Sequence, residues 1–317
     1  MTQIIIAGIL SFLVAIFTTP MLVRYFSGVG KGQEIREDGP QLHLRKRGTP
    51  TMGGLAILLA ITVAYLVVGI YARVTGNGGF SPSGLLVYFL TMGLGGLGFA
   101  DDFIKLFKKR NLGLNKTAKL VGQLAIALIF GILALQFPDA NGLTPASTNL
   151  SFVRDFDTFD IAVGGAVIGT IIFLVFLYLL IAAWSNAVNL TDGLDGLATM
   201  PVIIAAMTFG IIAYLVGNAV FAEYLGVHFV PGTGELLVFV SALIGGGLGF
   251  LWYNAPPAAV FMGDTGSLAL GGGLAGLAIL SRTELLIVIL GGLFVTITLS
   301  VIIQVASFKS TGKRVFR

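Results

Sequence analysis

The chain has 317 residues, of which 56% are hydrophobic and only 11% are charged. Soluble domains carry roughly a quarter charged residues, so this composition excludes a soluble enzyme. The 44 glycines fit a multi-span membrane protein, because glycine is more frequent in membrane helices than in soluble ones. The absence of cysteine excludes disulfides, zinc–thiolate sites and thiol nucleophiles. The net charge is +4, but the 19 basic residues fall in short loops between apolar stretches, which argues against nucleic-acid binding.

Nine stretches contain no Asp, Glu, Lys or Arg and approach the roughly 20 apolar residues that a bilayer-crossing helix needs. They predict an all-α polytopic membrane protein, with nine transmembrane helices in one integral-membrane domain over residues 1–317. The eighth stretch is short and glycine-rich, so it is expected to be either a short span or a broken, re-entrant segment. The nine stretches are Thr2–Val23, Gly48–Ala72, Val74–Ala100, Leu120–Pro138, Ile161–Thr191, Gly196–Ala222, Leu236–Gly263, Thr265–Ser281 and Leu285–Phe308.

Basic residues gather on one side if consecutive stretches alternate in direction. All but three of the 19 Lys and Arg, namely Arg73, Arg154 and Arg282, then share one face. Positive charge marks the cytoplasmic side of a membrane, so this face is expected to be cytoplasmic and the N-terminus to lie outside. The first stretch lacks a signal-peptide pattern and is expected to be a retained helix. The longest external loop, at about residues 139–160, is expected to be a solvated connector.

Five aspartates lie at the cytoplasmic ends of the apolar stretches, where ionisable groups tend to mark functional cavities. The five are Asp101, Asp102, Asp192, Asp195 and Asp264. Two adjacent ionised carboxylates near an apolar boundary need a cation such as Mg²⁺ or lysine. An ordinary helix-surface pair between Asp101 and Lys105 would explain only the first of them. The cluster therefore predicts a site for a cation and an anionic substrate.

The segments around the other three aspartates allow two interpretations each. Ser185, Asn189 and Asp192 share one face of a predicted helix, whereas capping of the next helix would explain only one aspartate of that segment. Asp264 precedes another helix, which it could cap. The same helix N-terminus, bare of side chains at its glycines, also suits a phosphate or a metal-bridged diphosphate.

A fourth segment, Thr-Pro-Thr-x-Gly-Gly at Thr49–Gly54, follows the basic run Arg45–Arg47. The basic run alone is an ordinary topology signal. The hydroxyls and backbone amides of the segment could instead hold phosphate or sugar beside Lys46. The two histidines, His43 and His228, give little support to a hydrolase.

At these four places the sequence resembles the polyprenyl-phosphate N-acetylhexosamine-1-phosphate transferases, most closely their phospho-N-acetylmuramoyl-pentapeptide-transferase branch. The resemblance covers nearly the whole chain and implies a fold of ten helices with both ends outside. Such proteins continue past the ninth helix into a loop with three consecutive histidines, whereas this sequence stops at Arg317, so nine helices and no such loop are expected. The matching motifs are RGTPTMGG at Arg47–Gly54, ADDFIK at Ala100–Lys105, NAVNLTDGLDGLA at Asn186–Ala198 and FMGDTGSLALGG at Phe261–Gly272.

The resemblance implies transfer of phospho-N-acetylmuramoyl-pentapeptide from its UDP carrier to undecaprenyl phosphate in the bacterial plasma membrane. The products are lipid I and UMP, in the first membrane step of peptidoglycan synthesis. The resemblance also implies Mg²⁺ as cofactor, contact with membrane lipids and a homodimer. Asp264 matches the magnesium ligand, beside the essential pair Asp101 and Asp102. For uridine, the resemblance implies contacts with Gly193, Leu194, Asp195, Asn254 and Phe261. For the neighbouring polar pocket it implies Lys46, Thr51, Asn189 and Asp192. For the lipid phosphate it implies Lys116 or Lys119.

Several alternatives remain open from the sequence. Asp101 or Asp102 either assists a direct attack by the lipid phosphate or forms a covalent phospho-sugar intermediate. The donor is UDP-N-acetylglucosamine in a sister reaction, although the motif wording argues against it. A transporter would need acids near the middle of the membrane, whereas these gather at one face.

Overall fold

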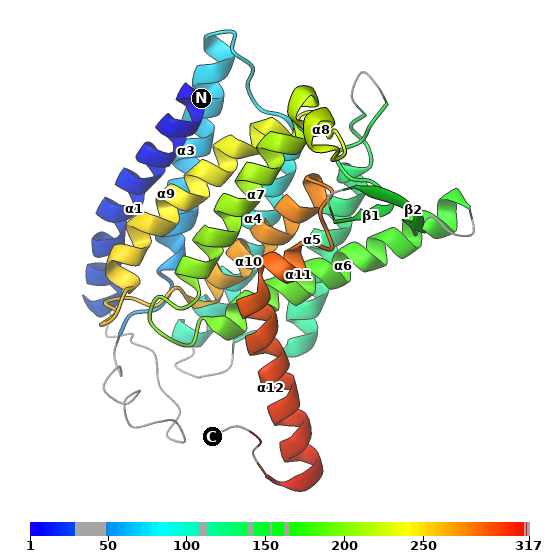
Figure 1. Cartoon of the computed structure of the whole chain (residues 1–317). Coiled ribbons are helices and arrows are strands. Elements are labelled where there is room, and N and C mark those ends of the chain that lie inside the picture. Colours follow the sequence, from blue (N-terminus) through cyan, green and yellow to red (C-terminus); the bar gives the residue numbers. More distant parts are fainter. Residues whose placement is uncertain are drawn as a thin grey trace.

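Membrane-length helices make up most of the computed structural model, which describes residues 1–28, 49–107, 113–138, 142–152, 154–161, 165–313 and 315 (Figure 1). Within these ranges, eight helices are long and apolar enough to cross a membrane. This confirms the predicted all-α polytopic membrane protein. The eight are α1 (Thr2–Gly28), α3 (Gly54–Val74), α4 (Pro82–Phe107), α5 (Lys116–Ala134), α6 (Ala166–Thr191), α7 (Thr199–Val216), α9 (Leu236–Asn254) and α12 (Gly292–Thr311).

The eighth predicted stretch forms α10 (Gly263–Leu280), a continuous helix that is surrounded by the others (Figure 1). All its residues from Thr265 to Leu280 are buried, and it contacts α3, α4, α6 and α7. The helix α10 is not among the eight helices above, because its glycines lower its mean hydropathy. Counted by length and composition, the described residues therefore contain eight spans and not the nine that the sequence predicted. Because α10 is continuous, the expectation of a broken segment for this stretch is wrong.

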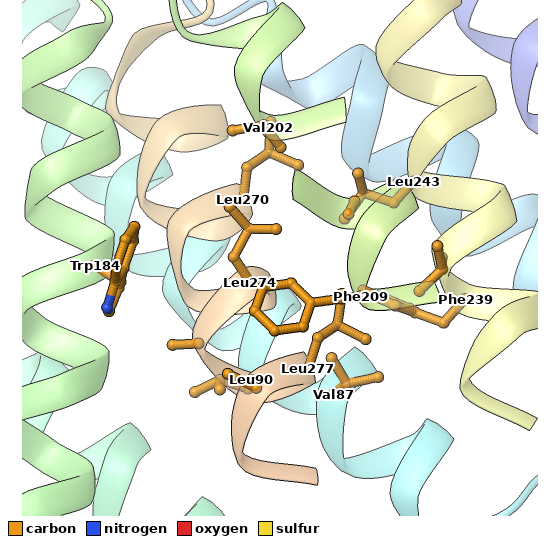
Figure 2. Close-up of a cluster of buried hydrophobic side chains, with 14 of the residues drawn as sticks. Val87, Leu90, Trp184, Val202, Phe209, Phe239, Leu243, Leu270, Leu274 and Leu277 are labelled. Atoms are coloured by element: carbon orange, nitrogen blue, oxygen red, sulfur yellow. The ribbon is translucent and has the colours of Figure 1, made fainter. Parts of the chain in front are cut away.

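Figure 2 shows how α10 forms the centre of the apolar core. Its leucines point toward side chains from α4, α7 and α9, while Trp184 of α6 lies on the other side. Lipid tails are as apolar as leucine, so close packing contributes more to such contacts in a membrane than the hydrophobic effect does. The labelled members are Leu270, Leu274 and Leu277 of α10, with Val87, Leu90, Val202, Phe209, Phe239 and Leu243.

The ninth predicted stretch is the one that is broken. The short helix α11 (Ile287–Leu290) ends at Gly291, and α12 continues from Gly292 and points away from the bundle (Figure 1). Any side chain at Gly291 would collide with the indole ring of Trp184. The break between α11 and α12 thus lies against α6, and Phe294 is the one buried residue of α12.

The loop between α5 and α6 contains an antiparallel hairpin, β1 (Asn149–Ser151) with β2 (Asp155–Asp160). Ser151 is buried, and its carbonyl accepts a hydrogen bond from the Leu285 amide at 3.1 Å. The expectation of a merely solvated connector is therefore wrong, because the hairpin is attached to the loop that follows α10. Two further short elements, α8 (Ala219–Leu225) and η1 (Thr233–Glu235), connect α7 to α9.

Candidate active site

Three aspartates from two helices meet at one end of the bundle. Asp101 and Asp102 lie in the last two turns of α4, and Asp264 is the second residue of α10. One oxygen from each carboxyl group lies within 4.8 Å of the others. The fold thus gathers into one cluster, called the acidic cluster below, aspartates that are far apart in the sequence.

Close packing of α4 against the start of α10 creates this cluster. A β-carbon at Gly98 would collide with the carbonyl group of Asp264, so only glycine allows the approach. Asp102 then anchors α10, because its Oδ2 accepts hydrogen bonds from the Thr265 amide at 2.9 Å and the Thr265 hydroxyl at 2.7 Å. A carboxylate at this position also interacts favourably with the helix dipole. Asp102 is only 2% exposed, so its Oδ2 holds the segment that carries Asp264.

Asp101 is oriented by the loop that follows α4. Its Oδ1 accepts a hydrogen bond from the Leu114 amide at 2.8 Å. Its Oδ2 forms an ion pair of 2.5 Å with Lys105, one helical turn further along α4. The two adjacent aspartates therefore differ, because Oδ2 of Asp102 is held by α10 whereas Oδ2 of Asp101 faces a side-chain ammonium.

Two lysines neutralise most of the charge of the acidic cluster. The Lys105 ammonium lies 3.6 Å from Oδ1 of Asp102 and 3.2 Å from Oδ2 of Asp264, in addition to its contact with Asp101. Lys119, in the first turn of α5, contacts Oδ2 of Asp264 at 2.7 Å. Three carboxylates and two ammonium groups leave a formal charge of −1. The cluster therefore still attracts a cation.

Asn189 of α6 completes the surroundings of Asp264. Its Nδ2 donates to Oδ1 of Asp264 at 2.7 Å and to the Ser267 hydroxyl at 2.8 Å. Ser185, one turn earlier, accepts a hydrogen bond from Gln123 at 2.9 Å instead. The predicted polar face of α6 thus exists, but only part of it reaches the acidic cluster.

Asp192 and Asp195 hold the turn after α6 against the segment before α10. Oδ2 of Asp192 accepts from the Gly263 amide at 3.1 Å, and Oδ2 of Asp195 accepts from the Ala258 amide at 3.2 Å. Neither caps α7, whose N-cap is Ala198 without a side-chain hydrogen bond, so the capping interpretation is wrong. Burial is the largest cause that raises the pKa of the Asp192 carboxyl well above its ordinary value of 3.8.

The Thr49–Gly54 segment, which was expected to hold phosphate or sugar, is hydrogen-bonded to the segment before α10. The amides of Gly53 and Gly54 donate to the carbonyls of Phe261 and Met262, each at 2.9 Å. These two amides are therefore engaged within the protein and do not face a phosphate, whereas the proposed role of the hydroxyls of this segment stays a prediction. Thr51 remains close to the site, because a β-carbon at Gly263 would lie within 2.8 Å of its hydroxyl.

The other predicted substrate positions lie in different surroundings. Asn254 is 1% exposed, and its amide group is engaged by Thr199 and the Val260 carbonyl, so it supports the neighbouring loop. Gly193 and Leu194 are exposed, Phe261 is half-buried, and Lys116 is exposed in the first turn of α5. Lys46 lies outside the described residues. The structure thus brings Asn189, Asp192, Thr51 and Lys119 to the acidic cluster.

Sequence reasoning missed three residues of this site. Lys105 was interpreted as a possible surface partner of Asp101 alone, although its spacing also places it one turn from Asp102. Thr265 and Ser267 follow Asp264, and their contacts with Asp102 and Asn189 depend on how three helices pack. Helical spacing could have indicated the first, whereas no local signal identifies the other two.

The donor set of the acidic cluster suits a hard divalent cation. All three candidate ligand groups are carboxylates, Asp101 and Asp102 are buried, and their oxygens converge. Mg²⁺ prefers oxygen ligands and is usually held by one or two carboxylates together with substrate phosphates. The residues present therefore fit such an ion.

Comparisons with known proteins show the family. Residues 84–282 match the model of glycosyl transferase family 4, and residues 46–58 match signature 1 of phospho-N-acetylmuramoyl-pentapeptide-transferase. Proteins with that name from Corynebacterium aurimucosum, Corynebacterium efficiens and Mycobacteroides abscessus are 64%, 60% and 50% identical over the whole chain. The alignments cover 86%, 87% and 87% of those proteins. The chain belongs to the phospho-N-acetylmuramoyl-pentapeptide-transferase family.

This membership agrees with the position of the site. The glycosyl transferase family 4 match contains all three aspartates of the acidic cluster, and the phospho-N-acetylmuramoyl-pentapeptide-transferase signature contains Lys46 and Thr51. The chain is therefore a transferase of a multi-pass membrane type. A transporter is not supported, because the acidic cluster lies at the ends of α4 and α10 and not midway along them.

Proposed function

We propose that the chain transfers phospho-N-acetylmuramoyl-pentapeptide from UDP-N-acetylmuramoyl-pentapeptide to undecaprenyl phosphate, forming lipid I and UMP in a Mg²⁺-dependent reaction. The relatives at 50–64% identity support the transfer by their names. The observation that carries the proposal is the acidic cluster with its two lysines. Phosphoryl transfer depends mainly on positioning and charge neutralisation, and this cluster has the groups for both.

The divalent ion has a defined place in this proposal. Asp264 is the proposed ligand, supported by Asp101 and Asp102, whose oxygens converge on the same point. Bound there, Mg²⁺ would neutralise charge on the UDP diphosphate and make UMP a better leaving group. Asn189 and Lys119 orient the Asp264 carboxylate by contacting one oxygen each.

The two adjacent aspartates have different proposed roles. Oδ2 of Asp102 accepts two hydrogen bonds from Thr265 and is unsuited to attack phosphorus. Oδ2 of Asp101 contacts an ammonium that can move, so Asp101 is the proposed group that orients the lipid phosphate and accepts its proton. An oxygen of that phosphate then bonds to the sugar-bearing phosphorus, the bond from that phosphorus to the bridging oxygen breaks, and UMP leaves.

The remaining substrate contacts follow from where side chains lie around the acidic cluster. Lys105 and Lys119 are proposed to contact phosphate groups, and Asp192 and Thr51 to border the neighbouring polar pocket. Uridine is proposed to bind between the exposed turn at Gly193–Asp195 and Phe261, which can stack on uracil. Lys46 is proposed to contact the donor, and Lys116 the lipid phosphate.

We place the chain, as a single integral-membrane transferase domain, in the bacterial plasma membrane. The acidic cluster then faces the cytoplasm, because the basic loops predict this side. A homodimer remains a prediction from the resemblance. Exposed apolar side chains along α1, such as Ile9, Leu13 and Phe17, fit contact with membrane lipids.

UMP release by the purified 317-residue chain tests the proposed function. Undecaprenyl phosphate and Mg²⁺ are supplied with either UDP-N-acetylmuramoyl-pentapeptide or UDP-N-acetylglucosamine, and lipid product is followed in parallel. Release with the muramoyl donor alone, lost on chelation of Mg²⁺, is the expected result. Release with the other donor alone would reassign the substrate, and release with neither would overturn the transfer reaction.

A pair of carboxylate variants provides the matched control. Asp101→Asn removes a charge from the acidic cluster and is expected to lower UMP release by at least about 10²-fold. Glu223→Gln removes one from α8, where Glu223 is exposed, and is expected to leave UMP release unchanged. A phospho-sugar adduct trapped on Asp101 or Asp102 during turnover would show that the reaction follows the covalent route and not direct attack.

A further inference from the structure

One ammonium group contacts all three carboxylates of the acidic cluster. The Nζ atom of Lys105 lies 2.5 Å from Asp101, 3.6 Å from Asp102 and 3.2 Å from Asp264. It therefore occupies the region where the three ligand oxygens converge. A divalent ion held by one oxygen of each carboxylate would need this same region, because those oxygens lie within 4.8 Å of one another.

The other lysines nearby are arranged differently. Among the described residues, Lys119 forms an ion pair with Asp264 alone, through Oδ2 of that carboxylate. Lys116, one turn before Lys119, forms no ion pair with the residues that the structure describes. Lys105 is therefore distinguished by its position within the cluster and not by its charge alone.

We propose that Lys105 is a built-in counter-cation of the acidic cluster, and that a divalent ion binds there by displacing its ammonium group. An ammonium and a divalent ion within a few ångströms of each other repel strongly in a partly desolvated site. Both also require the same carboxylate oxygens. The inference rests on the divalent-ion part of the proposed function, and it assigns Lys105 a role in ion binding that the sequence alone did not indicate.

Displacement leaves Lys105 available for the substrate. Its side chain is 33% exposed and extends from the last turn of α4, so the ammonium can leave the carboxylates without movement of the backbone. A diphosphate held beside the ion offers new partners for the displaced ammonium. Divalent-ion binding and diphosphate binding are then coupled, and each strengthens the other.

Binding of Mn²⁺, measured by electron paramagnetic resonance without nucleotide or lipid, tests the displacement. Lys105→Gln is expected to bind Mn²⁺ about tenfold more tightly than the unchanged chain, because no ammonium competes for the carboxylates. Lys105→Arg keeps the charge and is expected to bind Mn²⁺ no more tightly than the unchanged chain. Lys116→Gln removes the same charge from the neighbouring surface and is expected to change the affinity by less than about twofold.

Thermal unfolding provides a second measurement on the same variants. Without Lys105 the three carboxylates repel one another, so Lys105→Gln is expected to melt at a lower temperature in the absence of divalent ions. Mg²⁺ is expected to raise its melting temperature by more than it raises that of the unchanged chain, because it binds the folded variant more tightly. Lys105→Met, of similar length, repeats the comparison if the glutamine variant does not fold.

The results separate this inference from the proposed reaction. Equal or weaker Mn²⁺ binding by Lys105→Gln would overturn displacement, even if the unchanged chain makes lipid I. Equal tightening by Lys116→Gln would also overturn it, because the effect would then be general surface charge. A chain that shows the displacement but releases no UMP would overturn only the transfer reaction.

Discussion

The two ends of α10 both bury charged side chains, but they use them in opposite ways. At its start, Asp264 lies beside two further carboxylates. Beyond its last turn, Arg282 and Glu284 are 6% and 1% exposed. Nη2 of Arg282 donates to the Thr144 carbonyl at 2.9 Å, and Oε2 of Glu284 accepts from the Ser151 amide at 3.4 Å. These charges hold the chain's own backbone.

The difference shows what each end contributes. A charged group hydrogen-bonded to backbone attaches one segment to another, and here it joins the hairpin to the loop after α10. Three carboxylates within 4.8 Å repel one another and need cations, which lowers stability unless a ligand uses the arrangement. We therefore expect substitutions at the start of α10 to affect activity more than stability, and substitutions beyond its end to do the reverse.

Asp264→Asn is the largest expected loss of activity. The amide keeps the size of the side chain but cannot supply an anionic ligand to a divalent ion, so UMP release should fall on the order of 10³-fold. The melting temperature should change little, because one of three repelling carboxylates is removed. UMP release within about tenfold of the unchanged chain would mean that Asp264 is not the metal ligand.

Glu284→Ala is expected to produce the opposite result. Its loss leaves the buried Ser151 amide without this acceptor, which costs about 1–3 kcal/mol of unfolding free energy. Thermal unfolding in detergent measures the loss, and UMP release per folded molecule should stay unchanged. Glu223→Ala on exposed α8 is the matched control, with an expected change within about 0.5 kcal/mol. Equal melting temperatures for both variants would show that Glu284 does not stabilise the fold.

Thr265→Val tests a residue that holds two segments of the chain together and also supports the acidic cluster. Valine has nearly the same shape but lacks the hydroxyl that donates to Asp102 at 2.7 Å. UMP release should fall about tenfold, because loss of one hydrogen bond to a charged group costs roughly 1.5–3 kcal/mol and loosens the anchor of Asp264. Thr265→Ser should restore most of the activity. Full activity of the valine variant would show that the amide of Thr265 alone holds Asp102.

Hydrophobic stretches predicted the helices well, but not their continuity. A stretch without charges predicts a helix of sufficient length, and eight predicted stretches contain one. The same signal cannot show that the helix breaks at Gly291, because Gly291 lies against Trp184, which is distant in sequence. It also missed the β1–β2 hairpin, whose attachment to Glu284 and Leu285 depends on tertiary contacts.

The acidic cluster was predictable in its members but not in its internal contacts. Aspartates at the ends of apolar stretches predicted that Asp101, Asp102 and Asp264 gather, since the cost of such charges marks functional sites. Which oxygen each one offers was not predictable, because Thr265 and Leu114 determine it through packing. Capping rules failed at Asp192 for the same reason, since a distant amide competed for the carboxylate.

Asp192→Asn is expected to have the smallest effect, a pH-dependent change in stability. Because burial raises the pKa of the Asp192 carboxyl above 3.8, the folded chain holds this proton more tightly than the unfolded chain does. The stabilisation from this group is therefore present below pH 3.8 and is lost as pH rises through the raised pKa. Asparagine can still accept the hydrogen bond from Gly263 but never ionises.

The melting temperature of Asp192→Asn, relative to that of the unchanged chain, should therefore increase as pH rises above 3.8 through the raised pKa of Asp192. Glu223→Gln, which removes an exposed carboxylate, should show no such trend. UMP release by Asp192→Asn should fall at every pH if this side chain borders the substrate, so stability would rise where activity is lost. A difference in melting temperature that does not vary with pH would mean that the ionised Asp192 carries no cost. The contrast between the two ends of α10 would then be confined to the acidic cluster.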